Sequence, residues 1–320
     1  GTQALIQKGL TFSKLGLTVV DEQHKFGVLQ RKMLLEKGHR PDVLVLTATP
    51  IPRTLAMTIY GDLDVSVISA LPPGRRPIRT LRLPEGERRK AYRMVRDEVA
   101  AGRQAYIVLP LVEESEKLDL QAVMQAAKRL GREDLAGLRI AVLHGRMKSA
   151  EKDQTMAAYK RGEVQVLVAS TVVEVGVDVP NATVMVIEHA DRFGLAQLHQ
   201  LRGRVGRGVH QSVCVLLSSS RAETARRRLE AMVRSSDGFV IAEDDLRIRG
   251  PGEFFGTRQW GVPELKAGNL IRDAALLDEA RQEALSLVQA DPQLRLPQHQ
   301  ALRATMIRKW KEKLSLGGIS

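Results

Sequence analysis

The amino-acid sequence predicts an α/β fold built on a parallel sheet, and three observations lead to that prediction. Short apolar runs rich in β-branched residues alternate with segments of helical periodicity. Most of these runs are continuously apolar, which is typical of strands buried on both faces of a parallel sheet. The chain has 320 residues, of which 43% are hydrophobic, enough to fill about two domains of roughly 150 residues each. We therefore expect helices on both faces of the sheet, joined by right-handed crossovers.

The predicted strands and helices alternate along most of the chain. A helix is expected over 87–101, closed by Gly102, and another over 149–161. The second has Ser149 as its N-cap, acidic residues in its first turn and Gly162 just past its end. Strands are expected at 17–20, 43–46, 105–109, 139–143, 164–168, 183–187 and 212–217.

A run rich in proline and glycine, ALPPGRRP at 70–77, predicts a linker between domains. Only two strands precede it, so 1–70 is expected to be the C-terminal part of a larger domain. Five strands follow it, so 71–218 is expected to form a complete domain. From 219 to 320 the pattern is helical and basic, with helices near 273–289 and 299–315.

The charge balance favours a nucleic-acid partner. There are 49 Lys and Arg against 37 Asp and Glu, a net charge of +12. Aromatic residues make up only 4%, which favours contact with backbone phosphates over base stacking. A single cysteine, Cys214, lies in an apolar run and excludes an internal disulfide. With neither a membrane span nor a signal-peptide pattern, a cytoplasmic location is expected.

Two arginines three residues apart, Arg204 and Arg207, lie in the run QLRGRVGRG at 200–208. On a helix or tight turn this spacing points both guanidiniums the same way, and a guanidinium offers a planar set of donors suited to phosphate oxygens. Glycines at 203, 206 and 208 predict a backbone that can come close to a polyphosphate. Taken alone, the run is equally compatible with a basic surface turn.

An acidic pair, Asp21 and Glu22, follows the first predicted strand. Ligands bind at the carboxyl ends of parallel strands, where an aspartate can hold Mg²⁺ and a glutamate can orient or deprotonate water. An exposed turn is the alternative. Acidic and arginine pairs together are the two halves of a nucleotide-hydrolysis site. Further candidate residues follow other predicted strands: Thr47, Thr49, Ser170, Thr171, Gly176 and Asp178.

These motifs, in this order, resemble the signature motifs of superfamily 2 helicases, and longer runs are similar to the RecG family of bacterial branched-DNA helicases. The resemblance covers essentially the whole chain and implies RecA-like domains with ATP in the cleft between them. The matching runs are DEQHKFGVLQR (21–31), LTATPIPRTLAMTIYGDLDVSVI (46–68), LHGRMKSAEKD (143–153), VEVGVDVP within 170–180, and IEHADRFGLAQLHQLRGRVGRG (187–208).

The resemblance implies ATP and Mg²⁺ as cofactors and assigns roles by position. Asp21 would hold Mg²⁺ and Glu22 would be the catalytic carboxylate. Arg207 would be the arginine finger, with Arg204 assisting at the γ-phosphate. The residues implied to bind ATP or couple it to DNA are Gln23, His24, Thr47, Thr49, Gly176, Asp178 and Gln200.

The resemblance also implies duplex and branched DNA, forks and Holliday junctions, as partners. A helical hairpin within 220–247 and the glycine-rich loop after it would drive translocation, although by sequence alone that loop could wrap back on its own domain. Single-strand binding protein is a further expected partner, and the protein is expected to be a monomer. The residues implied to contact DNA are Thr2, His144, Arg146, Ser170, Thr171, Arg249, Arg258 and Gln259.

No G-x-x-x-x-G-K-[S/T] phosphate-binding loop occurs in the 320 residues. We therefore expect the chain to be the C-terminal portion of such a helicase, with little ATP turnover alone. One alternative is the motor portion of the transcription-repair coupling factor, against which Gln23 and His24 argue. Another is a non-catalytic helicase-like module that binds nucleic acid, against which Glu22, Arg204 and Arg207 argue.

Overall fold

The computed structural model describes residues 3–7, 9–21, 33–34, 36–38, 41–47, 66–68, 70, 72, 74–110, 116–170, 178–249 and 272–317. Contacts divide the chain into two units. The first unit comprises Gly1–Thr49, Thr54–Leu63 and Val262–Ser320, and the second comprises Pro50–Arg53 and Asp64–Gly261. Among the described residues, no helix is both long and apolar enough to cross a bilayer.

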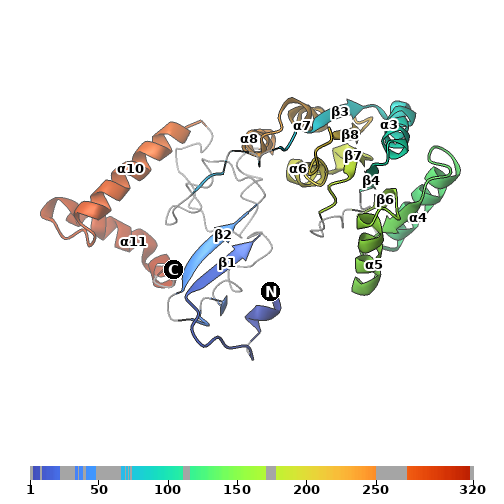
Figure 1. Ribbon diagram of the computed structural model, residues 1–320. Helices are drawn as coiled ribbons and strands as arrows, with labels where there is room; N and C mark the ends of the chain where they lie inside the picture. The colour runs from blue at the N-terminus through green and yellow to red at the C-terminus, as the bar shows by residue number, and fades with distance from the viewer. Residues whose placement is uncertain are drawn as a thin grey trace. The chain divides into compact units, whose positions relative to one another are not determined.

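The second unit is built on a six-stranded sheet in which all neighbouring strands are parallel (Figure 1). The strand order is β3-β8-β7-β4-β6-β5, so the central strands are flanked on both sides. This confirms the predicted α/β class. The strands are β3 (Arg79–Leu83), β4 (Gln104–Val108), β5 (Ile140–Leu143), β6 (Val166–Ala169), β7 (Ala182–Ile187) and β8 (Val213–Leu217).

Helices cover both faces of this sheet, because successive side chains of a strand point to opposite faces. On β4, Ile107 belongs to a core cluster that includes residues of α3 and α4, whereas Tyr106 belongs to a second cluster that includes residues of α5, α6, α7 and α8. Every residue of β4, β6 and β7 is buried, as their continuously apolar sequences predict. The helices are α3 (Arg88–Ala100), α4 (Glu116–Arg132), α5 (Ser149–Lys160), α6 (Leu195–Arg202), α7 (Glu223–Arg234) and α8 (Gly238–Arg249).

Two details of this unit differ from the sequence-based expectation. Strand β3 was not expected, because Arg79 and Arg82 interrupt its apolar pattern, but it pairs along its length with β8 at the edge of the sheet. Ser149 is not the N-cap of α5: it is the first helical residue, and Lys148 occupies the cap position. There the Lys148 backbone N–H donates to the Glu151 carboxylate at 3.0 Å, so the acidic first turn supplies the capping contact.

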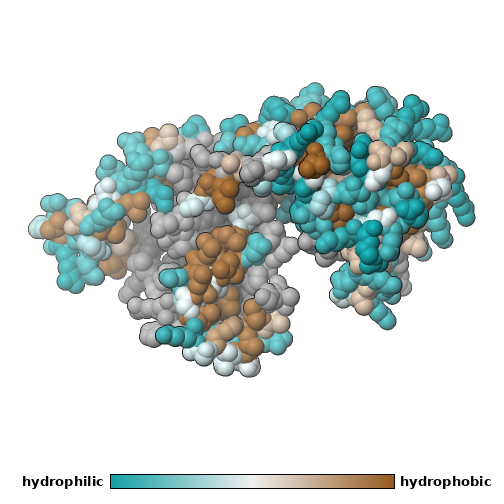
Figure 2. Space-filling model, viewed as in Figure 1, coloured by the Kyte–Doolittle hydropathy of each residue, from teal (hydrophilic) through white to brown (hydrophobic). Residues whose placement is uncertain are grey.

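The first unit contains η1 (Gln3–Ile6), the parallel pair β1 (Leu17–Asp21) and β2 (Asp42–Leu46), η6 (Pro297–His299), and the helices α10 (Ala274–Ala290) and α11 (Gln300–Gly317). Burial of β1 alternates, and Leu17 and Val19 are 56% and 52% exposed. Figure 2 shows apolar surface over these two strands. The expectation that strands are buried on both faces is therefore wrong for β1 and β2.

Candidate functional site

The arginine pair lies in a turn, residues 203–208, which we call the arginine turn. It directly follows α6, whose buried apolar residues are Leu195, Leu198 and Leu201. At the start of α6 the backbone N–H of Gly194 donates to the Gln197 side chain at 3.1 Å. Packing of this apolar face on the sheet fixes the helix, and the helix in turn fixes the start of the arginine turn. Gln200 lies on α6, half-buried.

Protein atoms pack closely against two glycines of the arginine turn. Gly206 has φ +75°, and a Cβ there would lie 2.6 Å from Cγ1 of Ile78. A Cβ on Gly208 would lie 2.4 Å from the carbonyl oxygen of Pro180. The space on the Cβ side of these two glycines is therefore filled by Ile78 and Pro180, and the predicted close approach of a polyphosphate to this backbone stays a prediction. The glycines let the turn seat on its own domain.

The structure brings Arg207, Arg204 and Asp178 into one locality. Arg207 Nη1 lies 3.5 Å from Asp178 Oδ1, and Arg207 Nε donates to the Gly203 carbonyl at 3.1 Å. Tyr106 of β4 lies near all three: burial raises its phenol pKa to about 12, while the charges of Arg204 and Arg207 lower that pKa and Asp178 raises it. The Arg207 side chain is 31% exposed, so its guanidinium is fixed in direction yet reachable by a ligand.

The arginine turn lies at the amino ends of the parallel strands. Pro180, against which Gly208 packs, comes two residues before β7, and the backbone N–H of Arg79 at the start of β3 donates to Ser212 just before β8 at 3.0 Å. This position follows from topology, because α6 carries the chain back from the carboxyl end of β7 to the amino end of β8. Sequence reasoning assigned the acidic pair to the carboxyl ends of its strands and assigned the arginine pair to neither end of a sheet.

Two of the predicted DNA-contacting residues do lie at the carboxyl ends. His144 follows β5 and Ser170 follows β6, and these strands pair with Leu143 opposite Ala169. His144 Nδ1 and Ser170 Oγ are buried without a hydrogen-bond partner among the described residues. Burial, and then the positive charge of Lys152, lowers the pKa of His144, so its ring is neutral near pH 7. Arg146 lies in the same β5–α5 loop.

Arg202, the last residue of α6, is a structural anchor that sequence reasoning missed. It is only 3% exposed, and its guanidinium donates to the carbonyls of Met232 at 2.9 Å, Ser235 at 2.8 Å and Ser236 at 3.2 Å. It therefore ties α6 to the C-terminal end of α7, where a cation is favoured. The spacing of Leu195, Leu198 and Arg202 was the available signal, since it places Arg202 on the apolar face of α6.

His199 also contacts Arg202, with its Nδ1 3.1 Å from Arg202 Nη2. Burial, and then the charge of Arg202, lowers the pKa of His199 to about 4. The imidazole is therefore neutral near pH 7 and can accept from the guanidinium.

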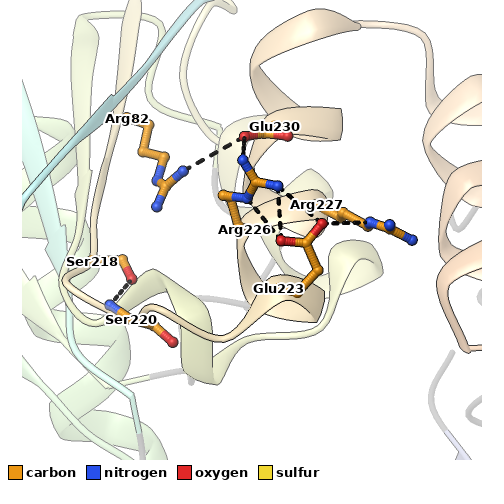
Figure 3. Close-up of polar contacts among 7 residues, drawn as sticks. All are labelled: Arg82, Ser218, Ser220, Glu223, Arg226, Arg227 and Glu230. Carbon is orange, nitrogen blue, oxygen red and sulfur yellow. Dashed lines mark hydrogen bonds and ion pairs between the residues drawn. The ribbon is translucent and has the colours of Figure 1, made fainter.

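The basic run Arg226–Arg228 on α7 is engaged within the protein. Figure 3 shows Arg226 and Arg227 against Glu223, at 2.8 Å and 3.0 Å, with Glu230 also facing Arg226 and Arg82. Arg228 donates to the carbonyls of Phe193 and Asp191, at 3.2 Å and 3.3 Å, beside the start of α6. Helix α7 thus contacts the segment before α6 through Arg228 and the end of α6 through Arg202.

Helices α7 and α8 occupy the place where the resemblance implies a hairpin, and α8 ends at Arg249. Arg249 Nε pairs with Asp245 Oδ1 at 3.0 Å, and a Cβ on Gly194 would lie 3.0 Å from Arg249 Nη2. The Arg249 guanidinium therefore lies against the N-terminus of α6.

In the first unit, Asp21 and Thr47 are neighbours at the carboxyl ends of β1 and β2. Asp21 is opposite Leu46 in the strand pairing, and Thr47 follows directly. Both residues are exposed. A carboxylate and a hydroxyl at adjacent strand ends are oxygen donors of the kind that Mg²⁺ accepts, so this part of the predicted site fits the ion. The remaining predicted residues lie outside the described part of the chain: Thr2, Glu22, Gln23, His24, Thr49, Thr171, Gly176, Arg258 and Gln259.

Comparison with protein families gives two matches. Residues 88–209 match the helicase conserved C-terminal domain, and residues 235–320 match the C-terminal part of domain 3 of ATP-dependent DNA helicase RecG. ATP-dependent DNA helicase RecG of Synechocystis is 54% identical over 318 residues, which is 99% of this chain and 38% of the relative. The Bacillus subtilis protein of that name is 48% identical over 96% of this chain and 45% of the relative. The chain thus spans less than half the length of these relatives.

Two solved structures are similar to this chain. A structure of RecG bound to a three-way DNA junction has 45% identity and a TM-score of 0.66, covering 87% of this chain and 35% of that one. Mss116p bound to single-stranded RNA and AMP-PNP has 16% identity and a TM-score of 0.53, covering 73% of this chain and 49% of that one, which shows a shared fold only.

Proposed function

This chain belongs to the RecG family of ATP-dependent DNA helicases, and we propose that it forms the C-terminal motor portion of a protein that hydrolyses ATP to move along duplex DNA. The observation that best supports this is the arginine turn. Arg207 is held beside Asp178, partly exposed, by a helix whose buried face fixes its position. Such a guanidinium suits a role in stabilising charge on a transferring phosphoryl group.

In this proposal the predicted site residues have different roles in ATP hydrolysis. Asp21 would hold Mg²⁺, which when bound would neutralise charge on the phosphates, and Glu22 would orient the attacking water. Arg207 acts as the arginine finger and Arg204 assists at the γ-phosphate. Gln23, His24, Thr47, Thr49, Gly176, Asp178 and Gln200 bind the nucleotide or couple it to DNA. Because the sequence contains no phosphate-binding loop, this chain alone is expected to turn over little ATP.

We further propose that the DNA is branched and that the whole protein remodels stalled forks and Holliday junctions in the cytoplasm as a monomer. The net charge of +12 supports a nucleic-acid partner, and a relative of known structure is bound to a three-way junction. Helices α7 and α8, held to α6 through Arg202 and Arg249, would pass movement of the arginine turn to the segment containing Arg258 and Gln259. Single-strand binding protein is a further proposed partner.

The test is ATP turnover by the full-length protein that contains this chain, with and without forked DNA. Arg207→Ala is expected to lower the DNA-stimulated rate by roughly 10³–10⁵. Arg89→Ala is the matched control, because Arg89 is exposed on α3 and its substitution removes the same charge as Arg207→Ala. Equal rates for Arg207→Ala and Arg89→Ala would contradict the proposed role of the arginine turn. Turnover by the isolated 320-residue chain, dependent on Arg207, would contradict the need for an upstream phosphate-binding loop.

A further inference from the structure

The arginine turn is attached to the segment that sequence analysis identified as an interdomain linker. Arg75 Nε donates to the Gly206 carbonyl at 3.1 Å, and Gln211 Nε2 donates to the Pro77 carbonyl at 2.7 Å. Ile78 packs against Gly206 so closely that a Cβ there would lie 2.6 Å from it. Residues 75–78 and the arginine turn therefore lie against each other within the second unit.

The contact from Arg75 falls on the peptide group that directly precedes Arg207. The Gly206 carbonyl belongs to the peptide that joins Gly206 to Arg207, so rotation about the Cα–C bond of Gly206 moves this carbonyl and the Arg207 Cα together. Gly206 has φ +75°, a conformation in which glycine has little steric preference of its own. The hydrogen bond from Arg75 therefore supplies an orientation that the glycine itself does not.

Arg75 is itself held in place on the linker. Its backbone N–H donates to the Pro72 carbonyl at 3.2 Å in a turn where Gly74 has φ +81°. Three residues on, the sheet begins with β3 at Arg79. Arg75 is thus fixed on both sides, and its side chain is partly buried.

We propose that Arg75 is a positioning residue for Arg207: through the Gly206 carbonyl it sets the direction of the catalytic guanidinium. This inference rests on the proposed ATPase function. Arg75 itself need not touch nucleotide or DNA.

The test compares Arg75→Ala with Arg76→Ala in the full-length protein, measuring ATP turnover with forked DNA. Arg76 is the matched control: it is the neighbouring linker arginine, it is exposed, and it makes no hydrogen bond or ion pair with the described part of the chain. Arg75→Ala is expected to lower kcat by about 10- to 100-fold, as small misplacements of catalytic groups do, with KM for ATP unchanged. Arg76→Ala is expected to match the wild type.

A second comparison separates positioning from a general folding defect. In an Arg207→Ala background, Arg75→Ala is expected to cause no further loss of single-turnover hydrolysis, because it has no guanidinium left to position. A further loss of the same factor would show a folding effect and overturn the inference. In the isolated 320-residue chain, hydrogen exchange at 203–212 is expected to speed up in Arg75→Ala but not in Arg76→Ala, with β4 and β7 unchanged; unaltered exchange at 203–212 would overturn the contact.

The remaining outcomes distinguish this inference from the proposed function. If Arg207→Ala abolishes turnover while Arg75→Ala equals Arg76→Ala, the positioning role alone is overturned. A raised KM with normal kcat in Arg75→Ala would mean that Arg75 binds the nucleotide directly, and this also overturns positioning. If the wild-type protein hydrolyses no ATP, the proposed function is overturned and the positioning role with it.

Discussion

Replacing Arg202 by methionine is expected to destabilise the second unit by about 3 kcal/mol. Its guanidinium donates to three backbone carbonyls at the end of α7, and a substitution at position 202 cannot remove those acceptors. A hydrogen bond to a charged group contributes roughly 1.5–3 kcal/mol, and a buried acceptor left without a donor costs about 1–3 kcal/mol. The Met232 contact is buried, whereas those to Ser235 and Ser236 are partly buried and water can replace some of what is lost. If each of the three carbonyls loses its donor at the lower end of this cost, about 1 kcal/mol, the total loss in the free energy of unfolding is about 3 kcal/mol.

Hydrogen exchange of the β4 and β7 amides measures this change, because amides in a fully buried sheet exchange through unfolding of the whole unit. Arg89→Met, on the exposed side of α3, is the matched control and is expected to change the free energy of unfolding by less than about 0.5 kcal/mol. Arg202→Lys keeps the charge but lacks the planar set of donors, so it should fall between the two. A loss below about 0.5 kcal/mol for Arg202→Met would refute the reasoning, since it would mean that the three carbonyls do not depend on Arg202.

Three further predictions concern individual positions. Gly206→Ala is expected to destabilise the second unit by about 1–3 kcal/mol, measured by urea unfolding, because φ is positive and the new Cβ meets Ile78. Adding Ile78→Ala should relieve only the clash with Ile78 and leave the cost of the positive φ. Full recovery of stability in the double variant would contradict a cost from the backbone conformation. The folded-state pKa of His199, about 4, is below its ordinary 6.5, so the unfolded state binds more protons and stability falls as pH drops from about 6.5 to about 4. His199→Gln should reduce this loss of stability, measured by unfolding curves at successive pH values. An unchanged dependence of stability on pH would contradict the prediction. The Asp291 carboxylate accepts from the backbone N–H groups of Leu296 and Arg295, at 2.8 Å and 3.0 Å, and these hydrogen bonds lower its pKa to about 2. Its contribution to stability is therefore lost as pH falls from about 4 to about 2. Asp291→Asn should speed amide exchange at 295–299, and unchanged exchange would contradict the role of Asp291 in holding this segment.

The sequence predicted the buried strands well, because burial on both faces of a parallel sheet leaves a continuous apolar run. It did not predict β3, whose Arg79 and Arg82 lie on an edge strand beside solvent. The ion pairs on α7 could have been predicted from the sequence. Glu223 precedes Arg226 and Arg227 by three and four residues, a spacing that brings side chains together on a helix.

The packing around the arginine turn could not be predicted from local sequence patterns. A glycine in the sequence reports only conformational freedom; that Ile78 and Pro180 fill the space beside Gly206 and Gly208 depends on contacts between distant segments. For the same reason, the apolar face of α6 placed Arg202 in the interior without indicating which carbonyls would satisfy it. Asp178 and Arg207 lie side by side in the structure, a contact that sequence reasoning did not predict, and the predicted roles of both residues stay predictions.

The course of α6 from one end of the sheet to the other has a consequence for how mutations should combine. It leaves the arginine turn and the His144–Ser170 end separated by the length of a strand, about 15–20 Å for five or six residues. At that separation side chains do not touch, so substitutions at the two ends should be additive if each acts locally. Any departure from additivity in a double-mutant cycle would therefore measure transmission through the sheet as a stiff body, and its size would be the energetic coupling between the two ends of the domain.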